Sequence, residues 1–395
     1  MFDGLFEGCQ LEDSMSFIQI VVAEDDATPS GASIRNKSNF DILSTLWSAK
    51  GGGRIIALRT DKKLGAKSDA AIVARLLRNE VMRLVDECRR EVPDFVLVEG
   101  VSLYQAAAAL AHAVPGLPLI VDMHNIESTL QMQIESQRFP RLLHNIASIF
   151  FVRHRRACLN VERQIVRIAK QVWVCSSTDK SMAEELFGAI PISVVPNPIP
   201  DWARAGVFEK DPGSTDVLFV GHLGYSPNRN AVKFLCTEVM PKLRRVVPNA
   251  QLHVCGRRPR RKVTALLRST GHRYSPNAQD LAQVYATAAA AAIPLRAGGG
   301  TRLKVLEAMA VGCPVIATGK AVEGLGLLPQ VHYKVAETAA EFSSEIAQVL
   351  ASRSLAEQMA QRAQQYTNEH YGQDARIERV RTALVDGKFL DGSGI

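Results

Sequence analysis

A glycine-rich stretch close to residue 300 has the residue types needed to hold a phosphate group. The three consecutive glycines at 298–300 have no Cβ, so the backbone can approach a ligand closely there. Thr301 follows them and is expected to cap a helix that begins at Arg302. The free N–H groups and partial positive charge of a helix N-terminus attract anions, which makes this loop a candidate phosphate site.

Two cationic side chains, Arg302 and Lys304, fall in the first turn of that expected helix. Cations at a helix N-terminus oppose the helix dipole, so this placement is unfavourable unless a bound anion compensates for it. The alternative is an ordinary glycine-rich loop in which Lys304 and Glu307 form an ion pair three positions apart. The sequence has neither a GxxxxGK[ST] phosphate loop nor a dinucleotide-binding GxGxxG motif after its first strand, which argues against those two nucleotide-binding classes.

Apolar strand-like runs alternate with amphipathic helical stretches along nearly the whole chain. In the first half, the expected strands are 18–23, 54–58, 95–99, 117–123, 171–175 and 192–196, and the expected helices include 39–48, 69–90 and 104–113. Continuous apolar strands separated by helices are typical of parallel sheets that helices cover on both faces.

Three closely spaced prolines, Pro196, Pro198 and Pro200, mark a domain boundary, because proline cannot continue a strand ladder. After it, the expected strands are 217–221, 251–255, 291–295 and 314–317, and the expected helices are 230–247, 278–287, 302–311 and 374–386. We therefore predict an α/β protein with a Rossmann-like domain over 1–198, a second one over 199–372, and a C-terminal helix and tail over 373–395. Open parallel sheets bind ligands beyond the carboxyl ends of their strands, so the chemistry is expected in the cleft between the two domains.

The composition is that of a globular protein. The chain has 395 residues, of which 47% are hydrophobic and 22% charged, and this argues against a disordered, collagen-like or disulfide-stapled protein. The net charge of +7 fits an anionic ligand or an acidic membrane surface, and the basic residues form no recognisable nucleic-acid module.

The seven cysteines are scattered, without a CxxC pair or a Cys/His arrangement with metal-ligand spacing. This distribution favours buried, reduced thiols in a cytoplasmic protein and predicts no metal site. The N-terminal residues lack the apolar length of a signal peptide, and the longest run of small apolar residues, 286–295, is far shorter than the roughly 20 residues that span a bilayer. We expect a cytoplasmic protein, either soluble or peripheral on the inner face of the membrane.

Several segments together resemble glycosyltransferase family 4, the group 1 transferases with the GT-B fold. The resemblance covers nearly the whole chain and is most specific in the LEAMAxGxPV pattern at 306–315. Four further segments are similar to family motifs: the loop after the first strand at 27–35, an HN-x-E segment at 122–128, a PN segment at 194–198 and the strand at 218–224. The resemblance implies two facing Rossmann-like domains, a cleft between them and a C-terminal helix that crosses back to the first domain.

The resemblance also implies roles for individual residues. Glu307 matches the second carboxylate of the family's E-x7-E motif, which binds the ribose hydroxyls, whereas the first carboxylate position holds Gly299. His222 stands where the family often has arginine, so Arg302 and Lys304 become the diphosphate candidates. The expected donor-binding residues are Gly299, Gly300, Thr301, Arg302, Leu303, Lys304, Glu307, His222, Arg229 and Gly256.

In the first half, the resemblance places His124 in the cleft near the reacting carbon, although a lone histidine is often structural. Gly31 and Arg35 follow the first strand and are expected near the diphosphate or the acceptor, with an ordinary turn glycine as the alternative for Gly31. The loop that begins at Gly256 is expected to line the nucleotide pocket or to be a solvated basic loop.

The stretch 138–170 is strongly basic and also apolar, with eight arginine or lysine residues against the single acidic residue Glu162. Basic and apolar residues together are typical of a surface that contacts anionic lipid, and the alternative is a helix with a solvated basic face.

The expected function is therefore that of a retaining glycosyltransferase. It would move a sugar from a nucleotide-sugar donor to a glycan acceptor in polysaccharide or glycoconjugate synthesis. The acceptor glycan is expected to be either free or attached to a lipid. The nucleotide sugar is a substrate, and neither a cofactor nor a metal is expected. The alternatives are a sugar-nucleotide epimerase or a phosphorylase on a similar fold, and a degenerate transferase that binds nucleotide sugars without catalysis.

Overall fold

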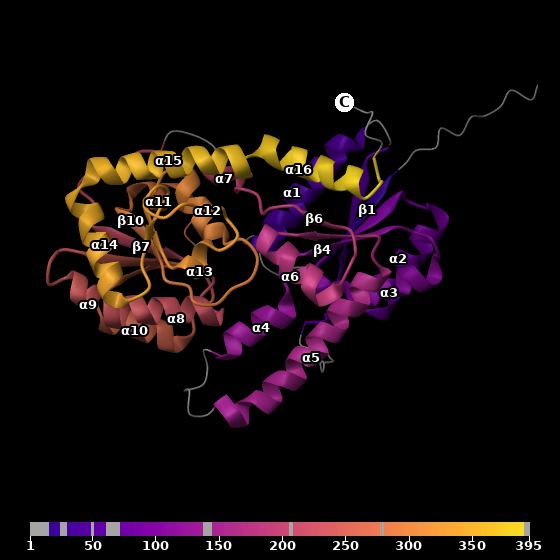
Figure 1. The fold of residues 1–395 in the computed structure, drawn as a ribbon, viewed down its shortest axis with the longest axis horizontal. Helices are drawn as coiled ribbons and strands as arrows, with labels where there is room; N and C mark the ends of the chain where they lie inside the picture. Colours follow the sequence, from indigo (N-terminus) through magenta and orange to yellow (C-terminus); the bar gives the residue numbers. More distant parts are fainter. Residues whose placement is uncertain are drawn as a thin grey trace, which may run out of the picture.

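Two parallel six-stranded sheets, each in its own lobe, form the framework of the protein (Figure 1). The computed structural model describes residues 16–23, 30–48, 51–60, 72–136, 144–204, 208–276, 278 and 280–390. A long pair of helices runs along one edge of the molecule and spans both lobes (Figure 1). Among these described residues, no helix is long and apolar enough to cross a membrane.

The first sheet has the strand order β2-β1-β3-β4-β5-β6. Its strands are β1 (Phe17–Val22), β2 (Gly53–Leu58), β3 (Phe95–Glu99), β4 (Leu119–Met123), β5 (Gln171–Val174) and β6 (Ile192–Val194). All residues of β3, β4 and β5 are buried, as expected for central strands that helices cover on both faces. The surrounding helices are α1 (Gly31–Leu46), α2 (Arg78–Arg90), α3 (Tyr104–Ala113), α4 (Glu127–Ser136), α5 (His144–Ile168) and α6 (Ser177–Phe187).

The second sheet has the strand order β12-β11-β10-β7-β8-β9. Its strands are β7 (Asp216–Val220), β8 (Gln251–Cys255), β9 (Arg273–Ser275), β10 (Ala290–Ile293), β11 (Val315–Ala317) and β12 (Lys334–Val335). Helices of this lobe are α7 (Asp201–Arg204), α8 (Ser226–Phe234), α9 (Met240–Leu243), α10 (Arg261–Ser269), α11 (Leu281–Thr287), α12 (Leu303–Ala310), α13 (Gly319–Val322) and α14 (Ala339–Ala351). Numbered within the domain, this is the order 6-5-4-1-2-3, which is that of dinucleotide-binding Rossmann folds.

The last two helices, α15 (Arg353–Tyr371) and α16 (Gln373–Asp386), form the edge that links the lobes. Helix α15 packs against α12 of the second domain, whereas α16 packs against α1 and β6 of the first. Gly372 separates them in an extended conformation, and a Cβ there would lie 2.2 Å from the carbonyl oxygen of Asn368. The predicted crossing of the C-terminal helix back to the first domain is confirmed (Figure 1).

Most predicted elements are present, and the differences have local causes. Helix α1 begins at Gly31 rather than at 39, because Ser30 and Ser33 form a capping box that starts it earlier. Helix α2 begins at Arg78, so the predicted start at 69 was wrong for the described residues 72–77; residues 69–71 lie outside the described part. The short edge strands β9 and β12 were not predicted.

Candidate functional site

The two sheets point their carboxyl ends into one large cavity between the domains. In each sheet the strand order reverses at one point, between β1 and β3 in the first and between β7 and β10 in the second. Ligands bind beyond the strands at such points in open parallel sheets. The cavity has a volume of about 1310 Å³ and is lined by residues of both domains. Among its lining residues are Gly31, Arg35, His124, His222, Gly256, Gly299, Thr301, Arg302, Leu303, Lys304 and Glu307.

The glycine loop of the second domain is pressed against the first domain. A Cβ at position 299 would lie 2.7 Å from Asn125 Oδ1, and a Cβ at position 300 would lie 2.6 Å from the carbonyl oxygen of His124. Gly300 also has a φ of 59°, a value that side chains with a Cβ rarely adopt. The glycines therefore allow the two domains to touch beside the cavity.

The side chain of Arg302 is hydrogen-bonded to the backbone of this loop. Its guanidinium donates to the carbonyl oxygens of Gly298, at 2.7 Å, and Gly300, and it lies 3.8 Å from Glu323. It occupies the N-cap position of α12, which begins at Leu303, so the expected cap at Thr301 was wrong. Arg302 thus lines the cavity while its hydrogen bonds go to the loop backbone.

Lys304 is the cation in the first turn of α12. Its Nζ donates to Asn228 Oδ1 at 2.7 Å and lies 4.9 Å from the centre of the Phe219 ring. A Cβ at Gly221, directly after β7, would lie 3.0 Å from the same nitrogen. Burial lowers the pKa of Lys304 to about 8. The ammonium therefore points at the end of β7, and the described structure contains no salt bridge between it and Glu307 within 4.0 Å.

Glu307 lies one turn further along α12 and is 9% exposed. The hydroxyl of Tyr285 donates to its Oε2 at 3.0 Å, and burial raises the pKa of its carboxyl group. The Tyr285 ring is stacked on Trp202, which also lines the cavity. One carboxylate oxygen of Glu307 is thus fixed by the protein in a side chain that faces the cavity.

Three other expected donor-binding residues surround the ends of β7 and β8. His222 and Gly256 line the cavity, and a Cβ at Gly256 would lie 1.9 Å from the carbonyl oxygen of Gly221, so this glycine allows two loops to pack closely. Arg229 donates to the carbonyl oxygen of Gly224 and is not among the described residues that line the cavity.

Gly31 and Arg35 belong to α1. Gly31 is the first residue of this helix. A Cβ added at Gly31 would lie 3.0 Å from Cδ1 of Leu303, which is the first residue of α12. The N-termini of the two helices therefore lie next to each other at the edge of the cavity. Arg35 is 1% exposed and donates to both oxygens of Asp122, from Nε at 2.6 Å and from Nη2 at 2.7 Å.

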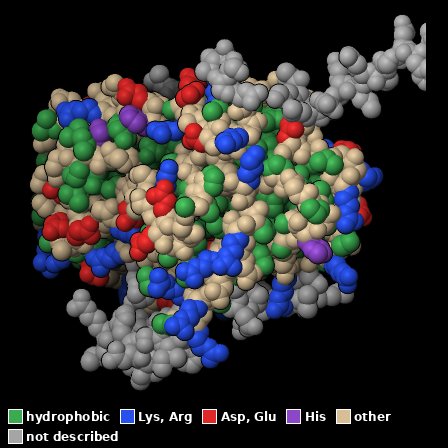
Figure 2. Space-filling view, turned by 45° about the vertical axis from the view of Figure 1, so that its right-hand side comes forward, with side chains coloured by type: hydrophobic (Ala, Val, Ile, Leu, Met, Phe, Trp, Pro, Cys, Tyr) green, Lys and Arg blue, Asp and Glu red, His purple; other side chains and the backbone are tan. Residues whose placement is uncertain are grey.

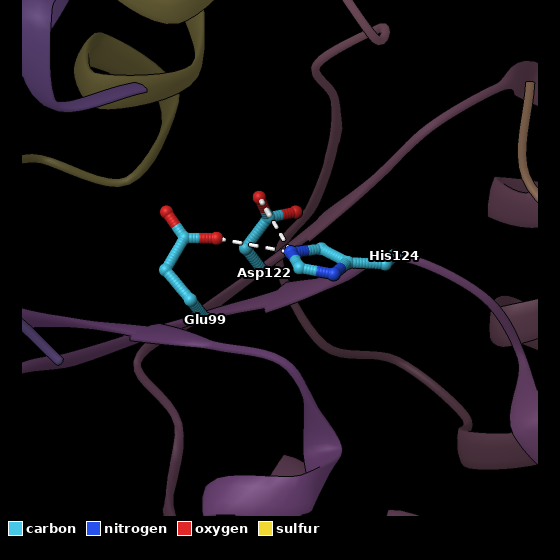
Figure 3. Close-up of side chains that lie close together, drawn as sticks. All are labelled: Glu99, Asp122 and His124. Carbon is cyan, nitrogen blue, oxygen red and sulfur yellow. Dashed lines mark hydrogen bonds and ion pairs between the residues drawn. The ribbon is translucent and has the colours of Figure 1, made fainter. Parts of the chain in front are cut away.

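His124 belongs to a buried network of ionisable groups at the ends of β3 and β4 (Figure 3). Its Nε2 lies 3.0 Å from Glu99 Oε2 and 3.8 Å from Asp122 Oδ2. Burial acts to lower the pKa of His124, but the hydrogen bond with Glu99 and the negative charges of Asp122 and Glu99 together outweigh it and raise the pKa. Burial acts to raise the pKa of Asp122, yet the positive charge of Arg35 lowers it. This arrangement favours a protonated imidazole beside a charged Asp122.

The ligand atoms of Glu99, Asp122 and His124 lie within 4.8 Å of one another, which is close enough to hold a metal ion. Both oxygens of Asp122 already accept from Arg35, and the amide of Asn39 donates to Asp122 at 2.8 Å and to Glu99 at 2.9 Å. A metal ion would displace these donors and lie beside a guanidinium, so the set fits an ion-paired network better than a metal centre.

The network reaches the linker and the last helix. Arg35 Nη1 donates to Asn197 Oδ1 at 3.1 Å, and Asn197 Nδ2 donates to the carbonyl oxygen of Thr301 at 3.0 Å. From α16, Arg376 donates to Asn39 Oδ1 at 2.5 Å and to the carbonyl oxygen of Pro196 at 2.9 Å. The side chains around His124 are thus tied to both domains.

Sequence reasoning missed the roles of Glu99, Asn197, Asn228 and Arg376 in this arrangement. One signal was available: Glu99 is an acidic residue at the end of an otherwise apolar strand, and such a charge is stable there only when it is paired.

Comparison with known proteins gives the same picture of the fold. Residues 214–352 match the model of the family described as "Glycosyl transferases group 1". Sucrose-phosphate synthase from Thermosynechococcus elongatus superposes with a TM-score of 0.67 at 15% identity, covering 93% of this chain and 98% of that one. HepE of Anabaena, solved with UDP, gives a TM-score of 0.63 at 14% identity over 94% and 99% of the two chains.

The fold is GT-B. A third structure, the apo lipopolysaccharide outer core galactosyltransferase WaaB, covers 94% of this chain and 99% of its own with a TM-score of 0.58 and 16% identity. A search of curated protein sequences gives no match. The group 1 resemblance is therefore confirmed over 214–352, and the GT-B architecture is confirmed over nearly the whole chain.

Proposed function

We propose that the protein is a glycosyltransferase of family 4. It transfers a sugar, with retention of anomeric configuration, from a nucleotide-sugar donor to a glycan acceptor, and it needs no bound metal. The observation that carries the proposal is that two helix N-termini, those of α1 and α12, meet at the edge of a cavity that the half-buried Lys304 also lines. Such a site attracts a diphosphate, because a helix N-terminus and a cation each favour a bound anion.

The donor nucleotide lies on the second domain in this proposal. Glu307 binds the ribose hydroxyls through the oxygen that Tyr285 does not occupy, and Lys304 binds the diphosphate. Positive charge fixed at the departing diphosphate stabilises it without a metal ion. HepE is solved with UDP, and this similarity supports a uridine nucleotide as the first ligand to test.

His124 faces the reacting carbon from the first domain. It lines the cavity, its carbonyl oxygen lies against the glycine loop, and its ring is oriented by Glu99. In this position a protonated imidazole stabilises negative charge that develops as the sugar–phosphate bond breaks.

Thermal-shift measurements with UDP, GDP, ADP and their hexose conjugates test the donor site directly. The matching nucleotide is expected to raise the melting temperature, because it stabilises the folded chain by RT ln(1 + [L]/Kd), where [L] is its free concentration. A chain that no nucleotide stabilises would contradict the proposal. Slow hydrolysis of the bound donor to free sugar and nucleoside diphosphate would then separate a working transferase from a protein that only binds nucleotide sugars.

A lipid-linked acceptor is the second part of the proposal, and helix α5 supports it. Its exposed positions 153, 156, 160, 163 and 167 alternate by three and four residues, so they share one face, and four of the five are arginines. Lys and Arg side chains gather on the lower part of the face in Figure 2, the edge where Figure 1 places α5. Residues 137–143 and the side chains of 144–151 lie outside the described part, so the phenylalanines at 150 and 151 add nothing to this argument.

Co-sedimentation with vesicles tests the membrane contact. Each basic residue near an anionic surface contributes about 1 kcal/mol, so the protein is expected to bind anionic vesicles at low salt and to be released at high salt. Replacing Arg153, Arg156, Arg163 and Arg167 by serine should abolish binding. Failure of the wild-type chain to bind anionic vesicles would favour a glycan acceptor without a lipid.

A further inference from the structure

A polar side chain of the first domain, Asn125, lies beside Gly299 at the edge of the proposed donor site. Asn125 Oδ1 lies 2.7 Å from the point where a Cβ at position 299 would be. Asn125 Nδ2 donates to Glu127 Oε1 at 3.3 Å. Both side chains line the large cavity, so an amide lies beside the glycine loop, and a carboxylate is hydrogen-bonded to that amide.

The carboxylate of Glu127 accepts hydrogen bonds from first-domain side chains, and Tyr225 of the second domain lies near it. Burial raises the pKa of Glu127, and hydrogen bonds from Asn125 and Gln131 act in the opposite direction. Tyr225, from the second domain, lies close enough that burial together with the charge of Glu127 raises the pKa of the tyrosine to about 12. Both Tyr225 and Gln131 line the same cavity.

Helix α4 is anchored in a way that fixes this carboxylate. Glu127 is the first residue of the helix, and the backbone N–H of Ser128 donates to Glu162 Oε1 of α5 at 3.2 Å. Glu162 is fully buried, so the start of α4 is tied to the neighbouring long helix. Glu127 therefore has a defined position relative to the glycine loop.

Resting on the proposed function, we infer that Asn125 and Glu127 bind hydroxyl groups of the transferred sugar. A sugar attached to a diphosphate at Lys304 would continue toward residues 298–300, where the polar side chain beside Gly299 and Gly300 is Asn125 of the first domain. A carboxylate accepts hydrogen bonds from two neighbouring hydroxyls, and an amide both donates and accepts. The ligand class is a hexose with free hydroxyls on the edge that faces α4.

This assignment also makes recognition of the sugar depend on both domains. The nucleotide contacts lie on the second domain, whereas the sugar contacts lie on the first. Variants of Glu127 are therefore expected to separate binding of the nucleotide from binding of the nucleotide sugar.

The test compares Kd values of UDP and UDP-glucose, with GDP and GDP-mannose as a second pair, for the full chain by calorimetry. Glu127→Gln and Asn125→Ala are expected to raise the Kd of UDP-glucose about tenfold, or that of GDP-mannose if GDP-mannose is the donor that binds. The Kd of the matching nucleoside diphosphate should change less than twofold. Unchanged nucleoside diphosphate binding also shows that each variant is folded. Glu185→Gln, an exposed carboxylate of the same domain on α6, is the matched control and should change neither value.

Deoxy analogues of the donor sharpen the result. One of the 2-, 3-, 4- or 6-deoxy sugars should bind the wild-type chain more weakly than the parent sugar, and Glu127→Gln should be insensitive to that deletion. An equal loss for nucleotide and nucleotide sugar, no loss at all, or an effect confined to the KM of the acceptor would each overturn the inference. If neither nucleotide pair binds the wild-type chain, the proposed function fails as well, and the two failures are thereby distinguished.

Discussion

Asn197 of the interdomain linker donates from Nδ2 to the carbonyl oxygen of Thr301, at the start of α12, at a distance of 3.0 Å. Its other amide atom, Oδ1, accepts from Arg35, the partner of Asp122. One side chain therefore connects the network around His124 with the glycine loop of the second domain.

Replacing Asn197 by alanine is expected to destabilise the protein. The substitution leaves a buried guanidinium N–H and a buried carbonyl without this partner, which costs about 1–3 kcal/mol in the free energy of unfolding. Chemical denaturation measures the loss. Asn160→Ala, at an exposed position of α5, is the control and should stay within about 0.5 kcal/mol of wild type. Equal stability of the two variants would show that the amide bridge is unimportant.

Because of the lowered pKa of Lys304, we expect binding of a nucleoside diphosphate to depend on pH. Its pKa of about 8 means that the free side chain loses its charge as the pH rises through 8, whereas a bound diphosphate favours the protonated form. Affinity for a nucleoside diphosphate should therefore fall between pH 7 and pH 9, and affinity for the bare nucleoside should not. The second phosphate ionisation, with a pKa near 6, lies outside this window. In Lys304→Ala the diphosphate should bind more weakly and the slope with pH should disappear.

Replacing Glu307 should affect the nucleoside and the nucleoside diphosphate equally, whereas replacing Lys304 should affect the diphosphate. Because ribose is present in both, Glu307→Ala should weaken the nucleoside and its diphosphate alike, by roughly 1.5–3 kcal/mol for a lost charged hydrogen bond. Tyr285→Phe removes only the donor to Oε2 and should have a smaller effect. A folded Glu307→Ala variant with wild-type nucleotide affinity would remove this residue from the site.

His124 and Glu99 should affect turnover more than binding. His124→Ala is expected to keep donor affinity within about threefold while transfer falls by roughly tenfold or more. Glu99→Gln removes a carboxylate whose hydrogen bond and charge, together with the charge of Asp122, raise the histidine pKa, so any change of turnover with pH that depends on His124 should move to lower pH. Wild-type turnover in His124→Ala would leave the residue with a purely structural role.

The same raised pKa predicts how His124 contributes to stability. A histidine whose pKa is higher in the folded state stabilises the protein fully below its unfolded pKa of about 6.5, and this contribution is lost as the pH rises through the folded value. The difference in unfolding free energy between wild type and His124→Ala should therefore be largest in mild acid. A difference that grows toward alkaline pH would contradict the pairing with Glu99.

Gly299 and Asn125 should behave as a coupled pair. Gly299 does not need a positive φ, so alanine fits its backbone, but the added Cβ would meet Asn125 Oδ1 at 2.7 Å. Gly299→Ala alone is expected to weaken donor-sugar binding, and the additional change Asn125→Ala should cancel this steric part. Additive effects in the double variant would show that the two positions do not compete for space.

The alternation of strands and helices could be predicted from the sequence because buried parallel strands are apolar along their whole length. Strand β3, at 95–99, was predicted with its observed bounds for this reason. The edge strands β9 and β12 could not be, because two or three half-exposed residues carry no pattern that distinguishes them from loop.

The candidate site was predictable where neighbouring residues carry the signal and unpredictable where distant ones do. The glycines and Lys304 stand together in the chain and suggested a phosphate site directly. The partnership of Arg376 with Asn39 joins residues 337 positions apart, and nothing local to either residue reveals it. The cap at Thr301 was wrong because α12 begins one residue later, at Leu303, and the carbonyl oxygen of Thr301 accepts instead from Asn197, 104 positions earlier in the chain.

The return of α16 to the first lobe means that the first domain is built from two separate pieces of chain. Arg376 completes hydrogen bonds of Asn39 and of the linker that residues before 200 leave open. Recombination that exchanged only the first half with a related transferase would pair these groups with a foreign helix. A working chimera would need to carry 373–390 together with the first domain, so the unit that can be exchanged is discontinuous in the gene even though it is compact in space.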